Sequence, residues 1–188
     1  MQNLKKSLLT IGLLTGLGWA ANAQTITANA NATSSATVLT DISVTKDSDI
    51  AFGNVLAGTT PTLDAQTFAN STDQGATATL GKFTVTGTPT ANVLVTFSTL
   101  VTMSNGDATD NLDFTPRVFR TALTDATDGE TTITSGGTYL INSSNSDSVS
   151  GTDYFFVGGT LEEVGGGNIP SDAAGLYTGT FTLTVAYN

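Results

Sequence analysis

The 188-residue sequence contains no cysteine and no histidine. The chain can therefore form no disulfide, Ser-His-Asp triad, cysteine nucleophile or His/Cys zinc site. Carboxylates and lysines could still do acid–base chemistry, but here they are scattered along the chain. We expect neither an enzyme nor a bound cofactor, and we expect a secreted form to be held together by its core alone.

Basic residues are also scarce. Six Lys and Arg stand against sixteen Asp and Glu, which gives a net charge of −10. Nucleic acid is not an expected partner, because a chain that binds phosphates needs a basic patch. Helical periodicity is almost absent, and a composition rich in threonine but poor in Lys, Glu and Leu favours strands.

The first two dozen residues have the three parts of a secretory signal peptide. Lys5 and Lys6 precede an apolar run over residues 8–19, and small residues follow it. The run is shorter than the ~20 apolar residues of a spanning helix, and no later stretch is long enough, so we expect no membrane span in the mature chain. We predict a signal peptide over residues 1–23 and export to the periplasm, then to the cell surface or beyond. The residues that define the cleavage site are Ala21, Ala23 and Gln24.

Alternation with period two predicts a series of short strands separated by polar loops. This pattern indicates an all-β protein, an antiparallel Ig-like β-sandwich of about seven to nine strands over residues 36–188. Residues 24–35 would form an N-terminal extension. A membrane barrel fits less well, because several strands are too short and aromatic residues are few. The expected strands cover residues 36–44, 49–55, 82–86, 92–97, 112–122, 131–141, 154–161 and 176–187.

The apolar residues of these alternating stretches are expected to face the interior of the sandwich. They are Ile42, Val44, Phe52, Phe83, Val85, Val93, Val95, Phe97, Phe181, Leu183 and Val185.

Charged residues offer little chemistry. Two acidic loops have oxygen ligands of the kind that calcium prefers. One contains Asp107, Asp110 and Asp113, and the other contains Asp125, Asp128 and Glu130. Neither loop has EF-hand spacing, so no metal site is predicted and calcium stays an open question.

Glu162 and Glu163 are adjacent on a strand and point to opposite faces, so they cannot flank one glycosidic bond. Arg117 and Arg120 also face opposite ways, and we interpret both as charges on a sheet surface.

Three short motifs resemble those of known secreted proteins. The end of the chain, with Gly175 fourteenth from the C-terminus and Tyr187 penultimate, resembles the C-terminal motif of chaperone–usher pilin subunits. Phe52-Gly53-Asn54 resembles the Phe-Gly element of spore coat protein U-like, archaic-type pilins. The mature chain is also similar to a family of uncharacterised secreted bacterial proteins that share a Val-Gly-Gly-Thr-Leu segment, here residues 157–161, and a Gly-x-Tyr-x-Gly-x-Phe ending, here residues 175–181.

The pilin resemblance implies a structural or adhesive surface subunit, built into a fimbria-like polymer by β-strand addition. It implies a periplasmic chaperone and an usher as partners, and a homopolymer or other surface subunits as neighbours. Many such pilins carry a disulfide, which this chain lacks. The residues expected to contact the chaperone or the next subunit are Gly175, Tyr177, Phe181, Leu183, Val185 and Tyr187.

The N-terminal extension itself alternates, with Ile26, Ala28, Ala30 and Ala32 on one side. We interpret residues 24–33 as a donor strand for a neighbouring subunit. A flexible spacer, or a strand that completes its own domain, is an equal alternative.

A second interpretation of the function is a self-contained secreted β-sandwich that binds carbohydrate or another surface protein. It requires an exposed aromatic platform. The residues that could form one are Tyr139, Tyr154, Phe155 and Phe156.

Overall fold

The computed structural model describes residues 30–106, 110–122, 131–142 and 151–188. The predicted signal peptide and its cleavage site lie outside these residues, as do Ile26 and Ala28. The chain divides into two units, Met1–Ala36 and Thr37–Asn188. In the first unit, the described residues 30–36 are exposed and form no strand or helix.

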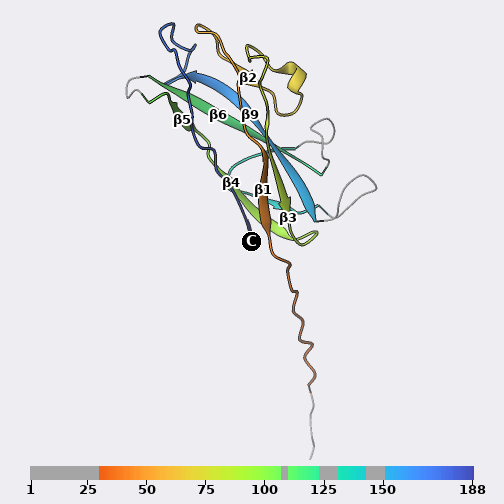
Figure 1. Ribbon diagram of the computed structural model, residues 1–188. Helices are drawn as coiled ribbons and strands as arrows, with labels where there is room; N and C mark the ends of the chain where they lie inside the picture. Colours follow the sequence, from red (N-terminus) through yellow and green to blue (C-terminus); the bar gives the residue numbers. More distant parts are fainter. Residues whose placement is uncertain (1–29, 107–109, 123–130, 143–150) are drawn as a thin grey trace, which may run out of the picture. The chain divides into compact units, whose positions relative to one another are not determined.

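The described residues form ten strands and one short 3-10 turn (Phe68–Asn70), and every strand pair is antiparallel (Figure 1). The larger sheet has the order β1-β3-β9-β6-β5, with β2 added to β9 and β7 to β6; the smaller sheet has the order β10-β4-β8. The prediction of an antiparallel β-sandwich is confirmed, with somewhat more strands than expected. The strands are β1 (Ser43–Ser48), β2 (Thr62–Leu63), β3 (Gly81–Thr86), β4 (Asn92–Phe97), β5 (Val101–Ser104), β6 (Asn111–Thr121), β7 (Thr131–Ile133), β8 (Gly137–Leu140), β9 (Thr152–Glu163) and β10 (Leu183–Tyr187).

The core contains most of the residues that alternation selected. Phe52, Val85, Val93, Val95 and Val185 are buried, and a second group is partly buried against them: Ile42, Phe83, Phe97, Phe181 and Leu183. Val44 faces the interior as predicted but is less buried than expected. Its side chain shares a face with buried Val85, its partner in the β1–β3 register, yet 38% of it is exposed. The reason is that β1 is an edge strand, so nothing in its own sheet covers its outer side.

Three predicted strands differ from the observed ones. The first begins at Ser43 rather than at residue 36. The segment 49–55 contributes only an isolated bridge between Ala51 and Thr79, because Gly53 turns the chain with a φ of +71°. Residues 131–141 contain two strands, because a turn at residues 135–136 directs β7 to the larger sheet and β8 to the smaller one.

The final segment also departs from the prediction, and the difference affects the candidate site. Alternation predicted one strand over residues 176–187, but the regular strand β10 covers only Leu183–Tyr187. Before it, Thr178 exchanges both backbone hydrogen bonds with Ser104 at the end of β5, at 2.9 and 3.0 Å. The chain therefore leaves the larger sheet and enters the smaller one within a few residues.

Candidate functional site

The side of β10 that faces away from β4, here called the β10 edge, is the most distinctive feature of the molecule. β10 pairs with β4 in an unbroken register from Leu183–Phe97 to Tyr187–Val93. Two backbone hydrogen bonds of 3.1 Å flank this pairing. Ser98 N–H donates to the Thr182 carbonyl, and Asn188 N–H donates to the Asn92 carbonyl. Even-numbered residues therefore bond to β4, and the N–H and C=O groups of Leu183, Val185 and Tyr187 point to the other side. Among the described residues, no strand pairs with that side.

The same three residues direct their side chains into the sandwich. Val185 is 7% exposed, whereas Leu183 and Tyr187 are only partly buried. Beside them, the Phe181 ring lies 5.8 Å from that of Phe83 and 6.2 Å from that of Phe97, between centroids, and all three rings are partly buried. The core along the β10 edge is thus apolar but incompletely covered.

β1, the edge of the larger sheet, lies beside β10 (Figure 1). It borders the same part of the core, with the half-exposed Val44 on its inward face. Two strand edges from different sheets, neither paired with another described strand, therefore meet over partly buried aromatic and aliphatic side chains. One more strand along the β10 edge would extend the smaller sheet and cover these side chains.

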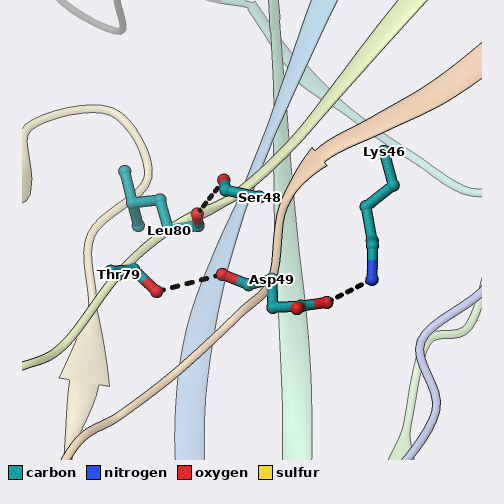
Figure 2. Close-up of polar contacts among 5 residues, drawn as sticks. All are labelled: Lys46, Ser48, Asp49, Thr79 and Leu80. Atoms are coloured by element: carbon teal, nitrogen blue, oxygen red, sulfur yellow. Dashed lines mark hydrogen bonds and ion pairs between the residues drawn. The ribbon is translucent and has the colours of Figure 1, made fainter.

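The β1 edge is irregular and charged. Its register to β3 shifts between Lys46 and Ser48, and Thr84 Oγ1 donates to the Asp47 carboxylate at 2.6 Å. Figure 2 shows how the end of β1 is fixed: Lys46 pairs with Asp49 at 2.5 Å, Ser48 Oγ donates to the Leu80 carbonyl, and Thr79 Oγ1 donates to the Asp49 carbonyl. A bulge and a lysine are common protections of an exposed strand against pairing. β10 has no charged residue, no proline and no shift of register.

Tyr187 ties the end of β10 to the rest of the domain. Its hydroxyl accepts the Thr88 N–H at 2.7 Å and donates to the Thr40 carbonyl at 2.7 Å. The penultimate tyrosine of the motif therefore positions β10 against the segment that leads into β1.

The first half of the C-terminal motif lies elsewhere, over β5. Gly179 packs so close to Val101 and Met103 that a β-carbon there would clash with both. Tyr177 receives a hydrogen bond from Asn105 Nδ2 at 3.3 Å, and Gly175, at a φ of +136°, lies next to the same Asn105. The structure thus separates the predicted contact residues: Gly175 and Tyr177 cover the edge of β5, whereas Leu183, Val185 and Tyr187 form the β10 edge. Ala30 and Ala32 are exposed in the first unit.

The other motif glycines permit close packing of backbone. A β-carbon at Gly158 would overlap the Leu63 carbonyl, and one at Gly159 would overlap the Thr115 carbonyl. Phe52 packs edge-on against Phe114, with ring centroids 5.5 Å apart. These residues hold the larger sheet together.

The aromatic residues proposed for a carbohydrate platform are not brought together. Phe155 is 1% exposed in the core, and the adjacent Phe156 is buried on the opposite face of β9. Tyr154 lies on the outer face under Lys82, and Tyr139 on β8 accepts the N–H of Thr134 in the turn between β7 and β8. No carbohydrate platform of these four residues forms.

The acidic loops lie largely outside the described residues, which include Asp110 and Asp113 but not Asp107, Asp125, Asp128 or Glu130. Within the described ranges, no group of three or more acidic residues could hold a metal ion.

Sequence reasoning missed one buried ion pair. Arg120 does face away from Arg117, but it points into the sandwich rather than to the surface, since it lies opposite Phe155 in the register. Its guanidinium bonds to Asp153 Oδ2 at 2.8 Å and to the Leu140 carbonyl, and Asn142 N–H donates to the same carboxylate oxygen. Leu112, Phe114 and Val118 are buried, and like Arg120 they are even-numbered residues of the same strand. Because alternate residues share a face, this pattern could have shown that the Arg120 side chain points inward.

Burial raises the pKa of Asp153 above its ordinary value of 3.8, although the hydrogen bond and the charge of Arg120 lower it. The Asp153 side chain is 3% exposed, and its Oδ1 has no hydrogen-bond partner in the described part of the chain. This pair closes one end of the core, where it joins β6 and β9 to the end of β8.

In the described residues, no helix has the length and hydropathy needed to cross a membrane.

Comparisons with known proteins place the whole sandwich in one family. No curated protein and no solved structure shows significant similarity to the chain. The family described as "Domain of unknown function (DUF4402)" matches residues 42–187, a range that includes every strand and all three motifs. The chain therefore belongs to the DUF4402 family.

Proposed function

We propose that this protein is a secreted structural or adhesive surface subunit that assembles by addition of a β-strand to its β10 edge. The observation that carries the proposal is the unpaired, regular and uncharged edge of β10 over a partly covered core. Strand addition gives affinity through main-chain bonds and register through alternate side chains, and this edge offers both.

The proposed occupant in the assembled state is the N-terminal extension of a neighbouring copy. Residues 24–33 alternate small apolar and polar side chains, so one face could lie over the partly buried rings while the other faces solvent. The predicted signal peptide makes a periplasmic chaperone the natural earlier occupant, because an unpaired edge left exposed during export would invite aggregation. An usher would then exchange one strand for the other.

The test is to delete residues 24–33 from the exported protein and to compare unheated samples by gel electrophoresis. Donor exchange predicts that the wild-type protein forms a ladder of non-covalent multimers and that the truncated protein stays folded but forms none. Ala28→Asp should weaken the ladder strongly, because it places a charge on the inward side of the donor strand. Thr27→Asp is the matched control and should leave the ladder intact.

Two results would contradict this proposal. If the truncated protein were unfolded as a monomer, the extension would complete its own domain. If it were stable and still formed the ladder, the extension would not be the donor.

A further inference from the structure

Charge is distributed very unevenly between the two sheets. Residues 83–106, 131–142 and 173–188 contain no Asp, Glu, Lys or Arg. These three stretches, far apart in sequence, supply all strands of the smaller sheet β10-β4-β8. Every charged side chain that lies on a described strand therefore belongs to the larger sheet.

The outer face of the smaller sheet is uncharged and partly apolar. Leu94 is 38% exposed and Leu140 is 54% exposed, while their neighbours Val93, Val95 and Ile141 are buried. Cross-strand pairing places Ala186 and Thr138 beside Leu94, and Thr184 beside Thr96. Leucine, alanine and threonine side chains therefore form most of this outer face, with Asn92 opposite Leu140 and the Asn188 amide bonded to Thr138 at its end.

We propose that this outer face is a lateral contact between two copies of the protein. Copies with a net charge of −10 repel each other, and that repulsion is weakest where both surfaces carry no charge. A strongly charged partner would gain no electrostatic attraction here, whereas a two-fold arrangement would match the leucines of one copy with those of another. The proposal does not rest on strand addition, which uses the edge of β10 rather than its face.

The size of the face indicates when the contact forms. Three strands of about five residues present roughly 250 Å² per copy, which is well below the ~800 Å² per partner of a stable complex. The contact is therefore weak in dilute solution and forms where many copies are held close together, as on a surface or in a concentrated solution.

The absence of cysteine makes a direct test available. Thr184→Cys introduces a single thiol on the proposed face, and Thr115→Cys introduces one at an exposed position of β6 in the larger sheet. Exported protein at high density is treated with a short bis-maleimide, and labelling with a maleimide–polyethylene glycol shows that both thiols are accessible. We expect a cross-linked dimer from Thr184→Cys and none from Thr115→Cys.

A second change tests the chemistry of the contact. Adding Leu94→Asp to Thr184→Cys should reduce the dimer at least about fivefold, because like charges then oppose each other across the contact. Adding Thr115→Asp, which alters the net charge equally, should leave the dimer unchanged.

Three results would overturn the proposal: no dimer from a fully labelled Thr184→Cys, equal dimers from both cysteine positions, or equal effects of the two aspartates. The multimer ladder, measured with the thiols capped, separates this proposal from strand addition. Leu94→Asp should keep the ladder, and deletion of residues 24–33 should remove the ladder while keeping the cross-link.

Discussion

β1 and β10 are edge strands of different sheets that lie side by side, and they differ in how they meet solvent. β1 carries Lys46, a shift of register and a set of side-chain bonds that fix its end. β10 is regular, uncharged and directs the main-chain groups of Leu183, Val185 and Tyr187 to its open side. A bulged, charged strand resists pairing, and a flat, uncharged one accepts it. Of these two edges, therefore, only that of β10 is suited to receive another strand.

Two other edges support this distinction. The edge of β5 is partly covered by the chain itself, through Thr178 and Ser104. β8, the other edge of the smaller sheet, is only four residues long, and short edge strands pair poorly. β10 is thus the edge whose regular, uncharged backbone favours strand addition.

The largest expected effect is on the free energy of unfolding, which should depend more on the fully buried interior than on the core next to the β1 and β10 edges. Phe155→Ala should lower the free energy of unfolding by about 3–5 kcal/mol, because that ring is fully buried. Phe181→Ala should cost less, about 2–3 kcal/mol, because its ring is only partly buried between Phe83 and Phe97. Denaturant unfolding of both variants measures the difference. Equal losses would mean that the core beside β10 is already closed.

A smaller effect is expected at the tie between β10 and the segment before β1. Tyr187→Phe removes the hydroxyl that joins the Thr40 carbonyl to the Thr88 N–H, and should cost about 1–2 kcal/mol. Tyr154→Phe is the control, since the described residues give its hydroxyl no hydrogen-bond partner; it should change stability little. If the two variants melted alike, Tyr187 would not hold β10 in place.

The smallest effect concerns the closed end of the core, at Arg120 and Asp153. Because burial raises the pKa of Asp153 in the folded protein, its contribution to stability is full below about pH 3.8 and is lost as the pH rises through the raised pKa. Asp153→Asn cannot titrate. The stability of the wild type relative to this variant should therefore fall as the pH rises from about 3.8 through the raised pKa. A relative stability that rises over this range would show that Arg120 outweighs burial.

Much of the fold could be predicted from the chain alone. Alternation located β3, β4, β6 and β9 to within a few residues, because a strand with one buried face must repeat its apolar residues every second position. The candidate site was predicted only in part. The motif from Gly175 to Tyr187 was recognised as one unit, but its halves lie on different sheets.

The sequence by itself determined that the protein is an all-β sandwich, which residues alternate toward the core and which stretches carry no charge. These properties depend on local spacing and composition. Only the tertiary structure decided that strands from three uncharged stretches meet in one small sheet and that Arg120 turns inward to Asp153. It also decided that β10, beside β1, has one edge with which no other described strand pairs. The physical reason is that alternation specifies the two faces of a strand, whereas its neighbours depend on hydrogen bonds and contacts between residues far apart in the chain.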